Sequence, residues 1–214
     1  MFEILSLYVG YNENILVEDA SFLFEYGKIY SISGDNGVGK TTFIKTISGL
    51  IASQGGQVSI DNKNLSSFTN QNRSSAISML FSRNSIDTSI KVSELFEFSL
   101  GDLFYKEGFE DQRKELLKYF HVEKLYNEPF GLLSDGQKQI ILLIRTFLKP
   151  ARVYIFDEPA IYLDMKTKEL LISYMRLSIL RDKKTMLIIS HDELFISKVA
   201  DIHLKIENRA LLEN

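Results

Sequence analysis

The chain has 214 residues, of which 45% are hydrophobic, so it can bury a substantial core. Its formal net charge of −3 argues against a general nucleic-acid-binding protein, which usually carries a basic excess. It contains no cysteine, which excludes disulfides, thiol catalysis and metal sites built on cysteine.

The apolar runs of the sequence are short. A run such as residues 140–144 falls far below the roughly 20 residues that span a bilayer. The first residues also lack the basic segment of a secretory signal peptide. We therefore expect a cytoplasmic protein whose link to any membrane passes through a partner.

Two strands are predicted at the beginning of the chain, over residues 2–9 and 17–24, with a turn at residues 10–14. Tyr11 lies in this turn, and an aromatic side chain there is able to stack on a purine ring. From the residues alone, an ordinary surface tyrosine is the simpler interpretation.

A glycine-rich segment follows a third predicted strand, residues 28–33, and precedes a helix predicted over residues 41–48 that Gly49 can end. Its residues fit G-x-x-x-x-G-K-[ST], the phosphate-binding loop. They are Gly34, Asp35, Asn36, Gly37, Val38, Gly39, Lys40, Thr41 and Thr42. Strand, loop and helix N-terminus direct backbone N–H groups at one point, which makes an anion site.

Three side chains of this loop have specific expected roles. Lys40 is expected to reach the β- and γ-phosphates of a nucleotide, and the Thr41 hydroxyl to bind Mg²⁺. Asp35 would place a negative charge beside the phosphates, so we expect its side chain to point outward.

The middle of the chain changes from strands to helices. Glycines 55 and 56 open a short predicted strand at residues 57–60, and residues 76–80 predict a central strand. Residues 83–133 predict a helical subdomain inserted into the core, in which Val92, Leu95, Phe96 and Leu100 share one face of a helix. Its aromatic residues exceed what a small helical unit needs for packing, so we expect most of them to pack in the core and one or two to form an exposed groove for a partner. These residues are Phe96, Phe98, Phe104, Tyr105 and Phe109.

Acidic residues and a histidine follow two predicted strands of the second half. Ser134 can cap a helix that runs to about residue 147. The next strand, residues 152–157, ends at Asp157 and Glu158, and a strand at residues 185–190 precedes His191. The carboxyl ends of buried strands face the ligand crevice of α/β proteins. Asp157 is thus expected to hold Mg²⁺ and Glu158 to polarise a water molecule. His191 would lie near the γ-phosphate.

The remaining segments complete an alternating pattern. A helix is predicted over residues 169–179, and short strands over 201–206 and 210–212. Alternation of strands and helices predicts an α/β fold with a largely parallel sheet and helices on its faces.

Taken together, these segments resemble the ATP-binding domain of ABC ATPases over essentially the whole chain. Residues 34–42 are similar to the Walker A loop and residues 133–137 to the LSGGQ signature. Residues 153–157 resemble Walker B, with Glu158 as the catalytic glutamate, and residues 160–164 fall where the D-loop lies.

The resemblance also assigns two single residues and an architecture. His191 matches the switch histidine, and Tyr11 lies where the family keeps its adenine-stacking aromatic residue. The implied fold is a P-loop NTPase of ABC type with an N-terminal antiparallel β subdomain. Its core would comprise residues 1–82 and 134–214, and the inserted helical subdomain residues 83–133.

The function implied by the resemblance is ATP hydrolysis that powers a separate membrane permease. Two chains, identical or paralogous, would bind two ATP molecules with Mg²⁺ head to tail. Each ATP would contact Ser134, Gly136 and Gln137 of the opposite subunit. The chain would then be peripheral on the cytoplasmic face of a membrane, with no nucleic-acid partner. The alternatives are a soluble ABC ATPase of assembly or repair and a slow-turnover regulatory subunit.

Three positions depart from the family pattern. Ser82 stands where a glutamine is usual, Asp135 replaces the first glycine of the signature, and Ile161 and Tyr162 replace small polar residues of the D-loop. These changes put the coupling between nucleotide and partner in doubt. Since Lys40 and the acidic residues remain, we expect hydrolysis to survive.

Overall fold

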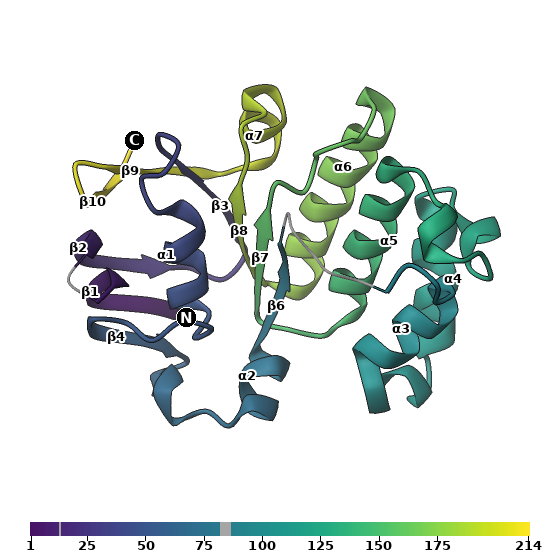
Figure 1. Cartoon of the computed structure of the whole chain (residues 1–214), viewed down its shortest axis with the longest axis horizontal. Coiled ribbons are helices and arrows are strands. Elements are labelled where there is room, and N and C mark those ends of the chain that lie inside the picture. Colours follow the sequence, from purple (N-terminus) through teal and green to yellow (C-terminus); the bar gives the residue numbers. More distant parts are fainter. Residues whose placement is uncertain (13, 82–86) are drawn as a thin grey trace.

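The protein is seen in a computed structural model that describes residues 1–12, 14–81 and 87–214. Two β-sheets and several helices form the layers shown in Figure 1. The smaller sheet is antiparallel, in the order β2-β1-β4-β5. Its strands are β1 (Phe2–Tyr11), β2 (Asn14–Phe24), β4 (Gly55–Ile60) and β5 (Lys63–Asn64).

The larger sheet has the order β10-β9-β3-β8-β7-β6 and is parallel except for β10. It confirms the predicted α/β class with a mostly parallel core and an antiparallel N-terminal part. Its strands are β3 (Lys28–Ser33), β6 (Ile77–Leu80), β7 (Val153–Asp157), β8 (Thr185–Ile189), β9 (Ile202–Glu207) and β10 (Ala210–Glu213).

The helices cover both faces of the larger sheet. Helix α1 lies between the two sheets, whereas α5 and α6 pack on the opposite face, with α3 and α4 beyond α5 (Figure 1). The α-helices are α1 (Lys40–Ile47), α2 (Asn70–Ala76), α3 (Val92–Leu100), α4 (Phe109–Tyr119), α5 (Asp135–Leu148), α6 (Met165–Asp182) and α7 (Glu193–Val199). Short 3₁₀ turns are η1 (Leu65–Ser67), η2 (Gly101–Tyr105), η3 (Glu123–Leu125) and η4 (Phe130–Leu132).

Alternation along the buried strands divides the apolar interior into two clusters. Successive side chains of a strand point to opposite faces of the sheet. In β7, Tyr154 and Phe156 accordingly join the cluster under α5 and α6, while Val153 and Ile155 join the one around α1. Helices on both faces thus fix β7, whose last residue carries the first acid of the site.

The strand predicted as central, residues 76–80, lies at the edge of the larger sheet, and this part of the prediction is wrong. Strand β6 pairs with β7 alone among the described strands. Its side chains Ile77 and Leu80 are nevertheless buried on opposite faces. A continuous apolar run indicates that both faces of a strand are buried. Helices can cover both faces of a strand at the edge of a sheet as well as at its centre.

The helical segment between β6 and α5 confirms the predicted apolar face of α3, since Val92, Leu95, Phe96 and Leu100 are all buried. The boundaries of a separate helical subdomain stay a prediction. Among the described residues, no helix is both long enough and apolar enough to cross a bilayer.

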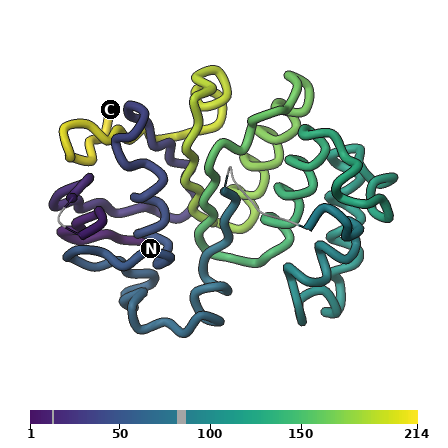
Figure 2. Tube along the Cα trace, in the orientation of Figure 1, coloured from purple at the N-terminus to yellow at the C-terminus, as the bar shows by residue number. Residues whose placement is uncertain are grey.

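The N-terminal and C-terminal strands meet at the end of the molecule remote from α3 and α4, as the trace in Figure 2 shows. The backbone N–H of Glu18 donates a 2.8 Å hydrogen bond to the carbonyl of Arg209, and their side chains form an ion pair. The turn between β9 and β10 thereby holds the β1–β2 hairpin in place.

Candidate active site

The glycine-rich loop connects the end of β3 to the start of α1, and its glycines allow close approaches that other residues would prevent. Gly34 has φ 143°, and a Cβ there would lie 2.5 Å from the carbonyl oxygen of Ile206. Gly39 occupies the N-cap position of α1 with φ 111°, and no described side chain caps the helix. The first N–H groups of α1 therefore face the pocket uncapped, which suits an anion.

Lys40 begins α1 and folds back over the loop. Its ammonium donates hydrogen bonds of 2.6 and 3.0 Å to the carbonyl oxygens of Gly34 and Asp35. The Asp35 side chain is exposed and does not line the pocket, as expected. The pKa of Lys205 is raised mainly by its hydrogen bond to Glu207 and also by Asp35, so the Asp35 carboxylate acts on the outer side of the loop.

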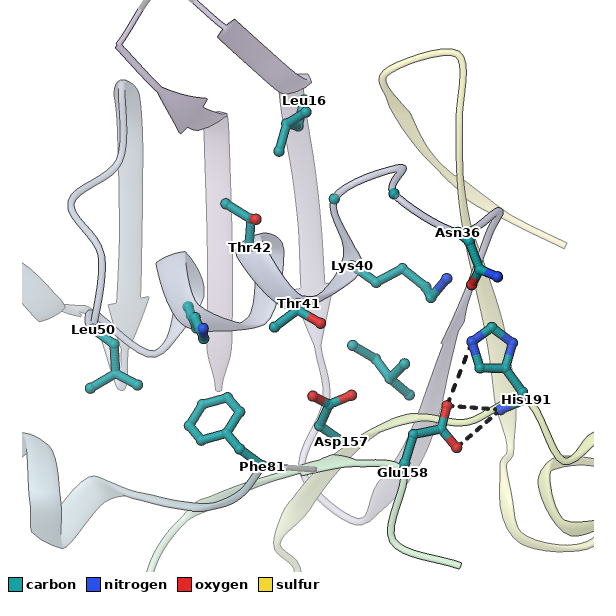
Figure 3. A pocket seen from close by; sticks show the side chains of 14 residues that line it. Leu16, Asn36, Lys40, Thr41, Thr42, Leu50, Phe81, Asp157, Glu158 and His191 are labelled. Carbon is teal, nitrogen blue, oxygen red and sulfur yellow. Dashed lines mark hydrogen bonds and ion pairs between the residues drawn. The ribbon is translucent and has the colours of Figure 1, made fainter. Parts of the chain in front are cut away.

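These elements surround a pocket of about 810 Å³ (Figure 3). The loop and α1 form one wall, and the ends of β7 and β8 form the facing wall. The lining residues are Leu16, Asn36, Gly37, Gly39, Lys40, Thr41, Thr42, Lys45, Leu50, Phe81, Asp157, Glu158, Ile189 and His191. Thus all three predicted catalytic residues and both predicted metal ligands line one space.

Asp157 ends β7 and is only 5% exposed, and its carboxylate points toward the Thr41 hydroxyl (Figure 3). A carboxylate and a hydroxyl are hard oxygen donors that fit Mg²⁺, which usually takes one or two protein ligands and completes its shell with phosphates and water. Consistent with this, the described residues contain no cluster of three or more His, Cys, Asp or Glu that would make an all-protein metal cage.

Glu158 adopts a left-handed backbone conformation, φ 54°, at the turn after β7. Its N–H donates a 2.8 Å hydrogen bond to the carbonyl of Ile189, so the turn is fixed to β8. Its carboxylate accepts hydrogen bonds from the Ser190 hydroxyl at 3.1 Å and from the His191 N–H at 3.1 and 3.3 Å. Strain at a non-glycine residue of this kind is typical of functional sites.

His191 lies beside this carboxylate, with 3.8 Å between its Nε2 and the Glu158 Oε1. The ring remains 63% exposed at the mouth of the pocket, whereas the Glu158 side chain is 19% exposed. The pair thus places a carboxylate and an imidazole at one point opposite the loop, as Figure 3 shows.

Three residues of this arrangement were missed from the sequence. Gln139 donates hydrogen bonds of 3.2 and 3.0 Å to the carbonyls of Glu158 and Pro159. Ser190 bonds the Glu158 carboxylate, and Leu16 lies where a Cβ on Gly39 would meet it. Gln139 carried a usable signal, because it is a polar residue on the buried and mostly apolar face of α5.

The signature segment forms the N-terminus of α5. Ser134 is the N-cap, and its hydroxyl accepts a 3.3 Å bond from the Gln137 N–H, while Gln137 Oε1 accepts a 2.9 Å bond from the Ser134 N–H. This confirms the predicted cap. A Cβ on Gly136 would lie 2.8 Å from the carbonyl oxygen of Tyr162. None of Ser134, Gly136 and Gln137 lines the pocket of its own chain.

Besides Asp35 and the three signature residues, the predicted positions Tyr11, Gly34 and Val38 do not line the pocket. Tyr11 is 49% exposed in the β1–β2 hairpin and does not line the pocket, so its stacking role stays a prediction. Val38 packs against the core beside Gly34. Ser82 lies outside the described residues.

Comparison with known proteins agrees with this geometry. Residues 17–161 match the family model described as ABC transporter. The chain is 30% identical over 168 residues to the cytochrome c biogenesis ATP-binding export protein CcmA of Legionella pneumophila (strain Paris), covering 77% of this chain and 80% of the relative. It is 25% identical over 218 residues to the petrobactin import ATP-binding protein YclP of Bacillus subtilis (strain 168), covering 100% and 86%.

Solved structures share the fold at lower sequence identity. A structure of the ATP-binding subunit of an ABC transporter superposes with a TM-score of 0.91 at 23% identity, covering 100% of this chain and 89% of that one. The dimeric bacterial ABC transporter cassette MJ0796 superposes with a TM-score of 0.86 at 22% identity, covering 100% and 98%. The chain belongs to the ABC transporter family, and its fold is that of the family's ATP-binding cassette.

Proposed function

We propose that this protein hydrolyses ATP with Mg²⁺ and thereby powers a separate membrane permease. The observation that carries the proposal is the convergence of five side chains on one pocket, although they come from three distant segments. They are Lys40, Thr41, Asp157, Glu158 and His191.

Each wall of the pocket has its own part in the proposed reaction. The uncapped N–H groups of α1 and the Lys40 ammonium hold the phosphates. Bound Mg²⁺, held by Thr41 and Asp157, would neutralise phosphate charge. Glu158 accepts hydrogen bonds from the Ser190–His191 turn, which orients its carboxylate toward an attacking water, and His191 stabilises charge on the transferred phosphoryl group.

The proposed active form is a head-to-tail dimer, identical or paralogous. Ser134, Gly136 and Gln137 present the N-terminus of α5 outside the pocket of their own chain, so only a second chain lets them contact the nucleotide. A helix N-terminus from the partner would add positive potential at the γ-phosphate. Closure on ATP and reopening after hydrolysis would then be the working motion.

Contact with a permease is the proposed role of exposed aromatic residues in the helical segment. Phe98 is 74% exposed and Tyr105 71% exposed, whereas Phe96 and Phe109 are buried. The two side chains belong to α3 and to the η2 turn that follows it, and a contiguous exposed apolar patch marks an interaction site. The names of the similar proteins support a role in transport. They include export, import and manganese-transport ATP-binding proteins.

Hydrolysis is tested by comparing ATP turnover of the wild-type chain with that of Glu158→Gln. We expect the substitution to lower turnover by roughly 100-fold or more, since it removes the proton acceptor while keeping the shape of the side chain. Glu193→Gln, an exposed carboxylate two residues after His191, is the matched control and should leave turnover unchanged. Equal turnover for wild type and Glu158→Gln would show that our role for Glu158 is wrong.

The transport role is tested by purifying a tagged chain from detergent-solubilised membranes and identifying the chains that accompany it. A membrane protein with several spans at matching stoichiometry supports the proposal. This membrane protein should no longer accompany the Phe98→Ser chain, while the isolated variant chain should still hydrolyse ATP. Recovery of the chain from the soluble fraction alone would favour a soluble ABC ATPase of assembly or repair.

A second candidate is a regulatory subunit with slow turnover, and one observation favours it. Asp135 opens α5 with its carboxylate 71% exposed, where a glycine is usual in the resembling family. Repulsion between this carboxylate and the opposing γ-phosphate would slow dimer closure. Steady ATP turnover that Glu158→Gln abolishes would exclude this alternative.

A further inference from the structure

An ion pair behind the pocket joins α6 to the turn that carries His191. The ammonium of Lys168 donates a 2.6 Å hydrogen bond to Oδ2 of Asp192, the residue after His191. Both side chains are about three-quarters buried, at 24% and 28% exposed. Neither residue lines the nucleotide pocket, so the pair has no direct contact with the proposed substrate.

Asp192 makes three contacts that fix the local backbone. Oδ1 accepts a 2.9 Å hydrogen bond from the Phe195 N–H, which caps α7, while Oδ2 holds Lys168. Its own N–H donates a 3.1 Å bond to the Ser190 hydroxyl. That hydroxyl in turn donates to the Glu158 carboxylate, so the contacts continue into the pocket without interruption.

The other end of this path is the start of α6. The Lys168 N–H donates a 2.9 Å bond to the carbonyl of Asp164, which is the N-cap of α6 and the last residue of the segment 160–164. Tyr162 in this segment is 65% exposed with φ 64°, and its carbonyl lies against Gly136 of the signature. Lys168 therefore stands one helical turn from the segment that would face a second chain.

We infer that Lys168 is a positioning residue, which acts through Asp192 to hold Ser190 and His191 in the geometry that orients Glu158. This inference rests on the proposed ATPase function. A partly exposed ion pair contributes little to the free energy of unfolding. If Lys168 had a purely structural role, its removal would therefore change the stability of the protein only slightly. A positioning role predicts instead a loss confined to the chemical step.

The test is Lys168→Met in the full chain, which keeps most of the unbranched apolar side chain and removes the ammonium. We expect kcat for ATP to fall about tenfold, because a small displacement of reacting groups is costly in rate. KM and the affinity for a fluorescent ATP analogue should stay within about twofold. Lys168→Arg retains a donor that reaches Asp192 and should restore most of kcat.

Two controls separate positioning from general damage. Lys166→Met changes an exposed lysine in the same helical turn and should leave kcat unchanged. Asp192→Asn keeps a side-chain oxygen for the α7 cap but weakens the pair, so its effect should not add to that of Lys168→Met. In NMR spectra, the His191 ring signal should shift in Lys168→Met, while the signals of His121 and His203 stay in place.

Several outcomes would overturn the inference. They are an unchanged kcat in Lys168→Met, a loss that Lys168→Arg does not restore, a rise in KM that accounts for the whole effect, or an unmoved His191 signal. A wild-type chain without ATP turnover would overturn the proposed function itself and this inference with it. Failure of the proposed function can be told apart from failure of this inference, because it would be seen in the wild-type chain without any substitution.

Discussion

The two helix N-termini of the proposed site, those of α1 and α5, are built in opposite ways. The N-terminus of α1 has a glycine cap with no side-chain acceptor. Its N–H groups face a pocket whose opposite wall carries Asp157 and Glu158. The N-terminus of α5 has a complete capping box from Ser134 and Gln137, and lies outside that pocket. The first is organised to receive an anion within one chain, while the second has two of its N–H groups satisfied by its own side chains.

This difference separates two kinds of contribution to the reaction. Binding of the phosphates depends on α1 and Lys40, which one chain supplies alone. Completion of the site depends on the signature segment, which has no nucleotide in reach until a second chain approaches. Substitutions on the α1 side should therefore affect ATP binding by the single chain as well as turnover, whereas substitutions on the α5 side should leave ATP binding by the single chain unchanged and act only in the dimer.

The largest expected effect follows Lys40→Ala. We expect ATP affinity to fall about 100-fold, because hydrogen bonds from an ammonium to phosphate oxygens contribute roughly 1.5–3 kcal/mol each. Turnover should fall at least as far. Titration with a fluorescent ATP analogue measures the affinity. Lys63→Ala, which removes an exposed lysine of β5, is the control, and a Lys40→Ala chain that bound as tightly as this control would contradict the assigned role.

Mixing of two inactive chains gives the sharpest test of the division. Ser134→Ala should bind ATP normally but hydrolyse it at least about tenfold more slowly, since the hydroxyl that would contact the γ-phosphate is lost from the opposite site. In a head-to-tail heterodimer with Lys40→Ala, one site combines both defects and the other has none. Equal mixing should thus restore up to about a quarter of wild-type turnover.

The mixing experiment has two built-in controls. Each variant alone should keep its own low turnover over the same concentration range, and two preparations of the same variant should not rescue each other. Ser134→Ala also loses a helix cap, which costs about 1 kcal/mol of folding free energy, so thermal melting must show that the chain remains folded. Failure of rescue with both chains folded and dimeric would contradict a shared site.

The contact of the signature with the segment 160–164 predicts the next effect. Gly136→Ala would place a Cβ 2.8 Å from the carbonyl oxygen of Tyr162, which is too close for an unchanged backbone. We expect turnover to fall about fivefold, while ATP affinity of the single chain stays the same. Turnover and affinity measured on one preparation distinguish this result from general unfolding, and a parallel loss of both would contradict it.

Much of the fold was predictable because local patterns and packing agree. The apolar run of residues 28–33 became β3 with the same bounds, and the apolar spacing of Val92, Leu95 and Leu100 became the buried face of α3. Helix α2 was missed because none of its residues is buried, so it has no apolar period. The edge position of β6 was missed because the order of strands depends on crossovers that no local pattern records.

The candidate site was predictable where a motif fixes the backbone. Spacing alone identified the glycine loop, and strand ends identified Asp157, Glu158 and His191. The hydrogen bonds from Gln139 and Ser190 were not predictable, since they depend on how α5 and β8 pack around the turn after β7. For the same reason the contact of Leu16 with Gly39 was not predictable, and the stacking role of Tyr11 stays a prediction.

The smallest expected effect concerns the charge that distinguishes this signature. Asp135→Asn removes a carboxylate that is 71% exposed in the first turn of α5, next to Lys138 at 4.0 Å. Its charge partly cancels the positive end of the helix, so its removal should lower the KM for ATP about two- to fivefold at low salt. The change should shrink as salt is added, because ions screen exposed charges.

Kinetics at two ionic strengths measure this effect, with Asp102→Asn as a control that removes an exposed acid from the helical segment. A salt-independent gain would indicate a change in packing rather than in charge. A fall in turnover would instead mean that Asp135 assists closure, for example by orienting Lys138 toward the second chain. The difference between α1 and α5 would then lie in which cation each uses, with Lys40 acting within its own chain and Lys138 across the dimer.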